Sequence, residues 1–483
     1  MKALPFFAAV VLFVSGWSNA RAQAPNFAHR NFPADTVKRV IEDVTRELSL
    51  KQPGFYRYTS RTEFRRYIDS VQLTIRDSLT ELQAYAKLKP IISKIHCLHT
   101  GLSLPPAYKA YLNQQPNLLP FQVYFADRKA YIIRNFSATK ELQPGDEVIS
   151  INGQSIEQIV SVLLPLIPAD GYNLTMKFRA LYYQFPTWYR TLDPADHFTL
   201  VTRRGKITRS DQINGAKYAD LAGDGFLEEP ARPHQLEFRI ENGIGFLTIH
   251  SFAETSIKKA DQNFRKFIDK TFADLRVKDI QNLVVDLRDN TGGTDHYAGY
   301  FTRYFFDQPF RYWDRIEVTE AVASEIKGIA LTAFYRKPVL QDSTWRWQKS
   351  RLTAEFDFYE TQQPAKNPYR GHVYVLINGF CMSSCADVAA ILSSNKKAVF
   401  IGEETGGGYQ GNNSGMIPET RVAPFDFVLS VPLQKYFNHV TPPPAPGHGT
   451  LPDYPVVPTL ADLLVGHDRT MTTTLNLIKS RAK

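Results

Sequence analysis

Apolar residues in the first hundred positions recur at helical spacing. A first set, three or four residues apart, predicts an amphipathic helix with Asp35 as its N-cap: Val37, Val40, Ile41, Val44 and Leu48. A second stripe runs from Phe64 to Leu88 and ends at Pro90, with a Pro53-Gly54 turn between the two sets. Residues 23–118 are therefore predicted to form a mostly helical region.

The pattern changes to short apolar alternations at Leu119. Runs such as Phe121-Gln-Val-Tyr and Ala130-Tyr-Ile-Ile are typical of strands, and Asn152-Gly153 marks a turn before a helical run that begins at Ser155. We expect residues 119–205 to form a small β-rich domain. The stretch 206–236 has weak periodicity with several Gly and Pro, and we interpret it as a linker.

Strands and helices alternate in the next segment. Buried strands are predicted at Ile244-Gly-Phe-Leu-Thr-Ile, Leu283-Val-Val-Asp-Leu and Val373-Tyr-Val-Leu-Ile, with helical stripes between them and after the last. This alternation is typical of an α/β domain whose parallel strands are covered by helices. We assign residues 237–466 to this domain and 467–483 to a C-terminal helix or tail.

The N-terminus has the three parts of a secretory signal peptide. Lys2 precedes an apolar run from Leu4 to Trp17, and Ala20-Arg-Ala22 is a small-x-small cleavage site. The run of about 14 residues is shorter than the roughly 20 that cross a bilayer, and no later segment approaches that length. The sequence predicts cleavage near Ala22, a secreted or periplasmic protein, and no stable membrane span.

Composition narrows the functional classes. With 43% hydrophobic and 22% charged residues the chain is too apolar for a disordered polymer. The formal net charge of +9 falls to +7 when residues 1–22, with Lys2 and Arg21, are removed. No block of five or six basic residues occurs, so nucleic-acid binding is not expected.

Two loops that follow buried strands carry candidate chemistry. In Asp286-Leu-Arg-Asp-Asn-Thr-Gly-Gly293, adjacent glycines can turn backbone N–H groups into open space, as an oxyanion hole requires, although an ordinary turn also fits. In Asn378-Gly-Phe-Cys-Met-Ser-Ser-Cys-Ala-Asp387, a serine lies on the loop between a buried strand and the following helix. That position suits a nucleophile and suits a plain N-cap equally well.

A serine hydroxyl needs a base to take its proton. Histidine is the usual base, and of the 11 histidines His96 and His99 stand in Lys94-Ile-His-Cys-Leu-His-Thr-Gly101. Spacing alone leaves a structural role for these histidines open.

These motifs resemble those of the C-terminal processing, or tail-specific, serine peptidases and the related tricorn protease core. The likeness covers about residues 50–465 in the family's order. It rests on five segments: Val285-Asp-Leu-Arg-Asp-Asn-Thr-Gly-Gly; Ser384-Cys-Ala-Asp387, with Asp for the family's Glu; Ile401-Gly-Glu-Glu-Thr-Gly-Gly-Gly408; Gly449-Thr-Leu-Pro-Asp453; and Leu142-Gln-Pro-Gly-Asp-Glu-Val-Ile-Ser-Ile-Asn-Gly.

The resemblance implies an α/β fold with a crotonase-like (ClpP/crotonase) catalytic domain, a PDZ-like domain at 119–205, and peptide-bond hydrolysis. Ser384 would be the nucleophile, with Gly292, Gly293 and Cys385 at the oxyanion hole. The substrate would be a polypeptide, whose C-terminus the PDZ-like domain can bind. No cofactor and no metal are implied.

The sequence departs from the family's pattern in its base and its acid. The Lys base of the processing branch is replaced by Gly408, whereas Cys97-Leu-His-Thr100 occupies the place of the tricorn-like His motif. The resemblance thus implies His99 as the base. The orienting Glu would fall near Pro446, where no acid stands, so Glu403 or Glu404 is the expected substitute.

Cys97, Cys381 and Cys385 all stand beside the predicted site residues. In an oxidising compartment we expect a disulfide from Cys97 to Cys381 or Cys385. The three thiols with His96 and His99 also offer zinc-type ligands, but their spacing matches no known template. A Cys385 nucleophile is conceivable, although the motif register favours Ser384.

Two functions follow from this pattern. The first is an exported serine endopeptidase that uses Ser384 and His99. The second is a weakened or inactive pseudo-protease of the cell envelope, which binds peptides without turnover because the acid is missing.

Overall fold

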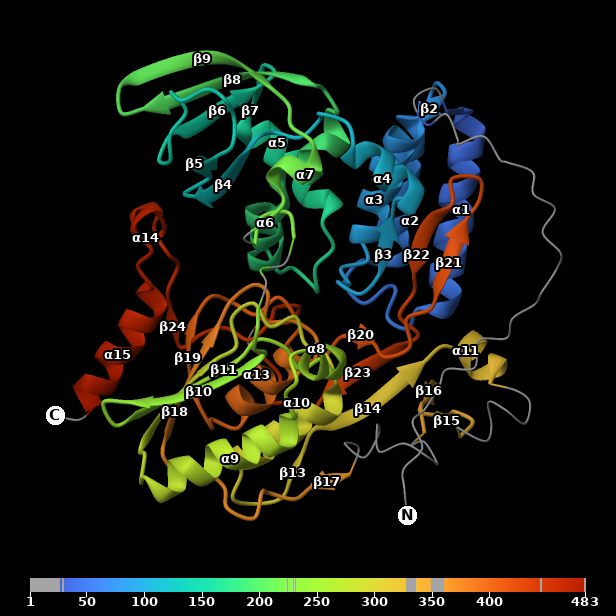
Figure 1. The fold of residues 1–483 in the computed structure, drawn as a ribbon. Helices are drawn as coiled ribbons and strands as arrows, with labels where there is room; N and C mark the ends of the chain where they lie inside the picture. The colour runs from blue at the N-terminus through green and yellow to red at the C-terminus, as the bar shows by residue number, and fades with distance from the viewer. Residues whose placement is uncertain are drawn as a thin grey trace.

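The computed structural model describes residues 27, 30–223, 225–228, 230, 232–326, 336–348, 360–443 and 445–481. The predicted signal peptide, 1–22, lies outside them. Within these ranges, no helix has both the length and the apolar character needed to cross a membrane. Figure 1 shows helices of the N-terminal region beside a sheet-containing unit, with a larger α/β body below both.

The α/β body is built on a six-stranded sheet of order β10-β11-β12-β18-β19-β24. Its strands run parallel except β10, which pairs antiparallel with β11 at one edge. Their bounds are β10 (Leu236–Glu241), β11 (Ile244–Ile249), β12 (Asn282–Asp286), β18 (His372–Ile377), β19 (Val399–Gly402) and β24 (Tyr454–Pro455). The predicted α/β organisation with parallel strands is confirmed.

Side chains alternate between the two faces of this sheet, and both faces are buried. Val285 and Val375 belong to a large core with helices on one face, whereas Val284 and Tyr374 belong to a second core with Ile478 on the other. The first face carries α9 (Phe264–Val277), α10 (Asp295–Thr302) and α13 (Ser384–Ser394); the second carries α15 (Arg469–Arg481). Burial on both sides explains the continuous apolar runs in the sequence.

The N-terminal region is helical, as predicted, but its helices start and end differently. It contains α1 (Ala34–Lys51), α2 (Arg61–Leu73), α3 (Glu81–Ser93) and α4 (Pro106–Asn113). Pro33 is the N-cap of α1, so Asp35 lies within the first turn and does not cap the helix. The second stripe is two helices because Ser60 and Thr80 each form a capping box, and Pro90 lies inside α3.

A strand pair from the C-terminal half completes this N-terminal region. Strands β21 (Glu419–Val422) and β22 (Phe427–Ser430) form a three-stranded sheet with β3 (Gly101–Ser103). Phe425, Phe427 and Leu429 are buried in one core with the N-terminal helices. This segment lies within the predicted catalytic domain, 237–466, in sequence, but it packs in the N-terminal region. Its pairing with β3 fixes that strand relative to the α/β body.

The β-rich unit consists of an antiparallel sheet with two helices. Its strand order is β4-β5-β6-β8-β9, with β7 paired to β6. The bounds are β4 (Phe121–Ala126), β5 (Lys129–Asn135), β6 (Glu147–Ile151), β7 (Gln154–Ser155), β8 (His197–Arg204), β9 (Ile207–Asn214), α5 (Ile156–Leu163) and α6 (Thr175–Leu192). Thus eight residues of the predicted linker, 206–236, form strand β9, which pairs with β8. Because these residues are mostly exposed and polar, the hydrophobic pattern did not predict a strand here.

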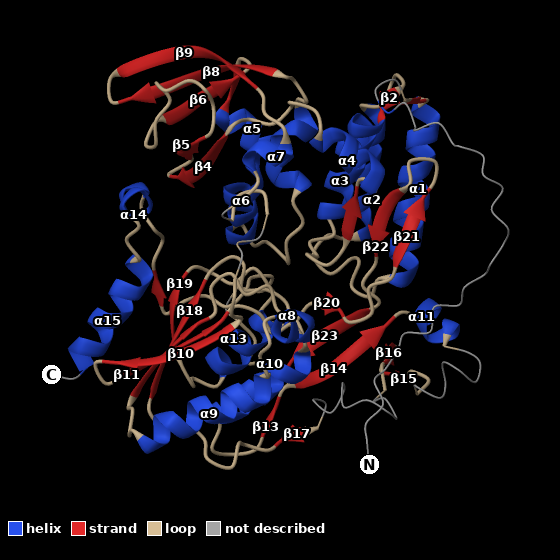
Figure 2. Ribbon diagram, viewed as in Figure 1, coloured by secondary structure: helices blue, strands red, loops and turns tan. Residues whose placement is uncertain are grey.

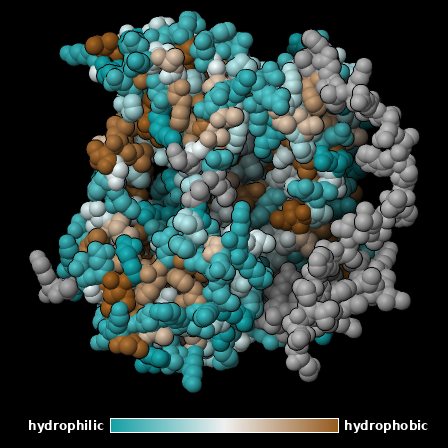
Figure 3. Space-filling model, viewed as in Figure 1, coloured by the Kyte–Doolittle hydropathy of each residue, from teal (hydrophilic) through white to brown (hydrophobic). Residues whose placement is uncertain are grey.

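A five-stranded sheet, β15-β16-β14-β23-β20, extends beside α13 and the large core. Its members are β14 (Trp313–Val318), β15 (Val339–Gln341), β16 (Thr344–Arg346), β20 (Asn413–Ser414) and β23 (Gln434–Asn438). Figure 2 shows this sheet between the central sheet and the N-terminal helices. The face drawn in Figure 3 is mainly hydrophilic, with hydrophobic side chains in small separate patches.

The remaining elements are short. They are β1 (Asn31–Phe32), β2 (Leu79–Thr80), β13 (Phe310–Arg311), β17 (Thr361–Gln362), α7 (Tyr218–Leu221), α8 (Glu254–Lys259), α11 (Glu320–Glu325), α14 (Leu460–Val465) and the 3₁₀ turns Leu164–Leu166 and Arg303–Phe305.

We expect Phe427→Ala to destabilise the protein by about 3–5 kcal/mol, because the fully buried ring joins β22 to the N-terminal core and stacks on Phe425. Val428→Ala, on the less buried face of the same strand, is the matched control. Denaturant unfolding measures both. Equal losses for the two variants would contradict the placement of this strand in the N-terminal core.

Candidate active site

The Gly292-Gly293 turn follows β12 and lies directly against the start of α13. Both glycines have positive φ, 94° and 142°. A Cβ on Gly292 would lie 2.7 Å from Ser383 Cβ and 2.8 Å from the carbonyl oxygen of Met382, and one on Gly293 would overlap the backbone of Ala253. Only glycine permits this approach, because any side chain would push the two loops apart.

Hydrogen bonds of Asn290 fix the turn from within. Its fully buried side chain donates to the carbonyl of Ile249 (2.8 Å) and accepts from the Gly292 N–H (2.9 Å). Its carbonyl accepts from the Met382 N–H (3.1 Å). One residue therefore holds both loops of the site in register.

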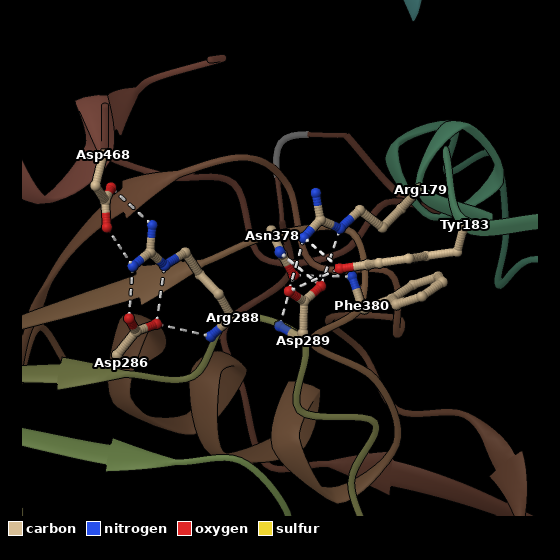
Figure 4. Close-up of polar contacts among 8 residues, drawn as sticks. All are labelled: Arg179, Tyr183, Asp286, Arg288, Asp289, Asn378, Phe380 and Asp468. Atoms are coloured by element: carbon tan, nitrogen blue, oxygen red, sulfur yellow. Dashed lines mark hydrogen bonds and ion pairs between the residues drawn. The ribbon is translucent and has the colours of Figure 1, made fainter. Parts of the chain in front are cut away.

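Figure 4 shows two groups of polar contacts after β12, one centred on Arg179 and Asp289 and the other on Arg288. Arg179 on α6 donates to both carboxylate oxygens of Asp289 (2.9 and 2.7 Å), while Asn378 exchanges hydrogen bonds with the Asp289 N–H and carboxylate (3.0 and 3.1 Å). Burial acts to raise the pKa of the Asp289 carboxyl, but the Arg179 charge and the Asn378 amide hold it below its ordinary value. Arg288 similarly joins Asp286 to Asp468.

Two consecutive serines lie at the end of this loop, and they differ in environment. Ser383 has φ 52° and ψ −132° and is partly exposed. Ser384 begins α13, is 1% exposed, and its Oγ has no hydrogen-bond partner among the described residues. A non-glycine residue with positive φ is strained, and such strain is concentrated at functional sites.

Ser383, His99 and Gly293 line one open cleft of about 800 Å³. Its other lining residues come from the starts of α8, α9 and α10, the residues just before α9 and α10, and β20 with the residues after it: Glu254, Asn263, Arg265, Thr294, Asp295, His296, Tyr297, Ser414, Gly415 and Ile417. Ser384 is not in this lining. The structure therefore brings the predicted histidine and glycine together with the serine one position before the predicted one.

His99 reaches the cleft because the next residues form β3, which pairs with β22. Burial lowers the pKa of the imidazole to about 4, with a smaller opposing effect from the carbonyl of Asn413. Its Nδ1 is buried and has no hydrogen-bond partner within the described part of the chain. A neutral imidazole above about pH 4 is the form that can accept a proton.

The amides predicted for the oxyanion hole are only partly available. The Gly292 N–H donates to Asn290, and the Cys385 N–H donates to the carbonyl of Met382 (3.0 Å). In the described structure the N–H groups of Gly293 and Ser384 have no acceptor. Ser384 N also lies against the Gly292 turn, 3.1 Å from where a Cβ would stand.

Neither acid expected to orient the histidine makes a hydrogen bond to His99 within the described residues. The Glu404 carboxylate accepts from His448 Nδ1 (3.1 Å) and from the Gly449 N–H (2.8 Å). Burial raises the pKa of Glu403, and Arg179 opposes this, so Glu403 faces the Arg179–Asp289 pair. A different carboxylate lies near His99: one oxygen of Asp170, a ring nitrogen of His99 and Cys97 Sγ are all within 4.8 Å of one another.

The predicted disulfide to Cys97 is wrong, because all three cysteines are free. Cys97 Sγ lies 3.8 Å from the carbonyl oxygen of Asn413, whereas Sγ of Cys381, in the loop before α13, lies 2.6 Å from Sγ of Cys385 in the first turn of α13. Burial raises the pKa of the Cys385 thiol well above its ordinary value, which disfavours the thiolate that a cysteine nucleophile needs.

Comparison with known proteins gives a family match for part of the chain and a structural likeness for most of it. Residues 243–456 match the model of peptidase family S41. A structure of mature CPAF complexed with lactacystin is 14% identical, covers 92% of this chain and 98% of that chain, and has a TM-score of 0.61. A second structure of mature CPAF is 15% identical, covers 89% and 95%, and has a TM-score of 0.59.

A photosystem II D1 C-terminal processing protease also matches, at 12% identity over 90% of this chain and 98% of that chain, but its TM-score of 0.39 adds nothing to the argument. No curated protein matches the chain. Residues 243–456 therefore match serine peptidase family S41, in agreement with the motif resemblance, and the chain as a whole has a mixed α/β fold.

Gly292→Ala is expected to slow reaction with a fluorophosphonate probe by about 10²-fold, because the new methyl group would displace Ser383 and the nearby amides. Gly205→Ala is the matched control, since Gly205 also has positive φ (59°) but has nothing within 4 Å of its Cβ position. Labelling rates and melting temperatures are compared. Equal rates for the two variants would show that the close contact is unimportant.

Proposed function

We propose that the protein is an exported serine endopeptidase in which Ser383 is the nucleophile, His99 the base, and the Gly293 and Ser384 N–H groups the oxyanion hole. The observation that carries this proposal is the single cleft lined by Ser383, His99 and Gly293. The proposal keeps the predicted histidine and the predicted Gly293, and moves the nucleophile from Ser384 to the residue before it.

The backbone supports the choice of Ser383. A serine on a sharp, strained turn from a strand to a helix presents its Oγ outward, and the N–H of the next residue faces the same space. Ser383 has that conformation, and the next N–H, of Ser384, has no acceptor in the described structure. With Ser384 as the nucleophile, the next N–H would be that of Cys385, which is already bonded to Met382.

The reaction follows from these roles. Ser383 Oγ attacks the carbonyl carbon of the substrate, and its proton passes to His99. The carbonyl oxygen becomes an oxyanion, which accepts hydrogen bonds from Gly293 and Ser384. The intermediate expels the amine, which takes the proton from His99, and leaves an acyl-enzyme. Water deprotonated by His99 then releases the acid and restores the serine.

We propose the finer fold assignments on the same basis. A parallel sheet with α13 starting beside a glycine turn supports a crotonase-like catalytic domain. An antiparallel sheet with α5 at its side supports a PDZ-like domain, which would bind an extended peptide or its C-terminus by strand addition. The two domains would present one polypeptide substrate to the cleft.

The alternative function is a peptide-binding pseudo-protease. The observation that favours it is the lack, among the described residues, of a hydrogen bond from His99 Nδ1 to any acid. Such a protein would keep the cleft and the peptide-binding domain but would not acylate its serine.

Labelling by a fluorophosphonate distinguishes these functions and the two serines. We expect one adduct, located on Ser383 by peptide mass spectrometry, that is lost in Ser383→Ala and slowed by roughly 10³-fold or more in His99→Ala. Ser384→Ala is the control, and it should retain labelling because its N–H remains. An adduct on Ser384 would refute the Ser383 assignment, and no labelling of any folded form would favour the pseudo-protease.

Export is tested separately. We expect the protein expressed with its own N-terminus in a bacterium to be recovered outside the cytoplasm and to begin at Gln23, as N-terminal sequencing would show. A change of the Ala20-Arg-Ala22 site to bulky residues should leave residues 1–22 attached. A mature protein that begins at Met1 in the cytoplasm would contradict export.

A further inference from the structure

Asp170 is a buried carboxylate that connects the histidine loop to the loop after β19. It lies in the segment 167–174, between the turn Leu164–Leu166 and α6. Asp170 is only 4% exposed. One carboxylate oxygen accepts from the Leu98 N–H (2.9 Å) and the other from the Gly408 N–H (3.3 Å). Each oxygen therefore has one neutral donor and capacity for another.

The same segment holds the histidine loop by its backbone. The Gly171 N–H donates to the carbonyl of His96 (3.0 Å), and His96 Nδ1 donates to the carbonyl of Gly171 (2.6 Å). Gly171 has φ 58°, and a Cβ there would overlap the carbonyl of Gly447. The two hydrogen bonds tie the segment that carries Asp170 to the loop that carries His99, and the Gly447 contact leaves no room for a side chain at position 171.

The Nδ1 atom of His99 is an unsatisfied nitrogen near this carboxylate, and the carbonyl of Asn413 also interacts with the ring. A ring nitrogen of His99 lies within 4.8 Å of an Asp170 oxygen, and the buried Nδ1 has no hydrogen-bond partner among the described residues. A small rotation of the imidazole, or one bridging water, is enough to connect the nitrogen and the oxygen over a distance up to this limit. A buried donor without a partner destabilises the folded protein, which favours a hydrogen bond from His99 to Asp170.

We propose that Asp170 is the positioning residue for His99: its carboxylate accepts the hydrogen bond of the imidazole nitrogen that faces away from the serine. This inference rests on the proposed function. Asp170 would fix the tautomer in which the other nitrogen can take the serine proton, and its charge would stabilise the imidazolium that forms. Glu403 and Glu404, the acids expected from the sequence, are engaged elsewhere.

The charges around Asp170 determine its pH dependence. Burial raises the pKa of its carboxyl to about 6, while the Leu98 and Gly408 N–H groups and the Arg57 charge act to lower it. The other titratable groups that face it are Tyr58, Cys97, His99 and Asp387. Because His99 is neutral above about pH 4, a change in rate near pH 6 would report the ionisation of Asp170.

The first test is the rate of fluorophosphonate labelling as a function of pH. For the wild-type protein we expect the rate to rise through about pH 6, as Asp170 loses its proton. Asp170→Asn should label roughly 10²-fold more slowly at pH 7.5 and should lose that rise. A purely structural role would lower the melting temperature and leave the pH profile unchanged.

The second test is a double-mutant cycle with His99→Ala. If Asp170 acts through His99, Asp170→Asn should have no further effect on labelling in the His99→Ala background. Asn173→Ala is the matched control: it removes the side-chain hydrogen bond to the carbonyl of Thr405 (3.0 Å) in the same segment but leaves Asp170 in place. This control should keep the wild-type pH profile even where it melts earlier.

The outcomes separate the two proposals. A wild-type protein that no fluorophosphonate labels would refute the proposed function. A labelled wild-type protein would overturn the Asp170 assignment if Asp170→Asn kept the rise near pH 6, or if its effect were equally large with and without His99. Should Asp170→Asn fail to fold, Asp170→Ser, which keeps a small hydrogen-bonding side chain, would be measured by the same profile.

Discussion

The site depends on the contact between the Gly292-Gly293 turn and the residues before α13. At 2.7 Å from a hypothetical Cβ to Ser383, no other residue type fits at Gly292 without moving a loop. This approach sets the distance between a free amide of one loop and a free amide of the other. The Asn290 carbonyl, which accepts from the Met382 N–H, and the hydrogen bonds between Asp289 and Asn378 hold the two loops together, so the amides are positioned before any substrate binds.

The imidazole of His99 comes from a part of the chain that is far from Ser383 in sequence, and several other segments are needed to hold it in place. His99 is placed by β3, which is only three residues long and depends on β22 for pairing and on the N-terminal core for burial. The segment around Asp170 adds hydrogen bonds from a third region. Three separate parts of the sequence therefore hold the loop that carries His99, and a loss of any of them would misplace its imidazole.

The sequence predicted the elements that carry strong periodic signals. The buried runs at 244–249, 283–287 and 373–377 became neighbouring strands, because a strand buried on both faces reads as continuously apolar. Two features were not predicted. One is the weakly apolar strand β9, and the other is the packing of β21 and β22 with the N-terminal core. Pairing between residues more than 300 positions apart, such as Leu102 and Leu429, leaves no local pattern.

Of the predicted site residues, His99 and Gly293 line the cleft, whereas Ser384 is buried behind Ser383. Motif order predicted Ser384, and the two serines have identical side chains, so only backbone angles and burial distinguish them. Asp170 had no signal beyond an Asp-Gly turn, since its partners are backbone amides and a histidine from elsewhere in the chain. The acids near the expected motif, Glu403 and Glu404, were predicted from position alone, and Glu404 pairs with His448.

A crystal structure of the protein after reaction with a fluorophosphonate tests the central claim most directly. The account predicts a covalent bond from phosphorus to Ser383 Oγ, with a phosphonyl oxygen about 2.7–3.1 Å from the backbone nitrogens of Gly293 and Ser384 and with the His99 ring beside the adduct. Phosphorus on Ser384 Oγ, or a phosphonyl oxygen directed away from both nitrogens, would contradict it.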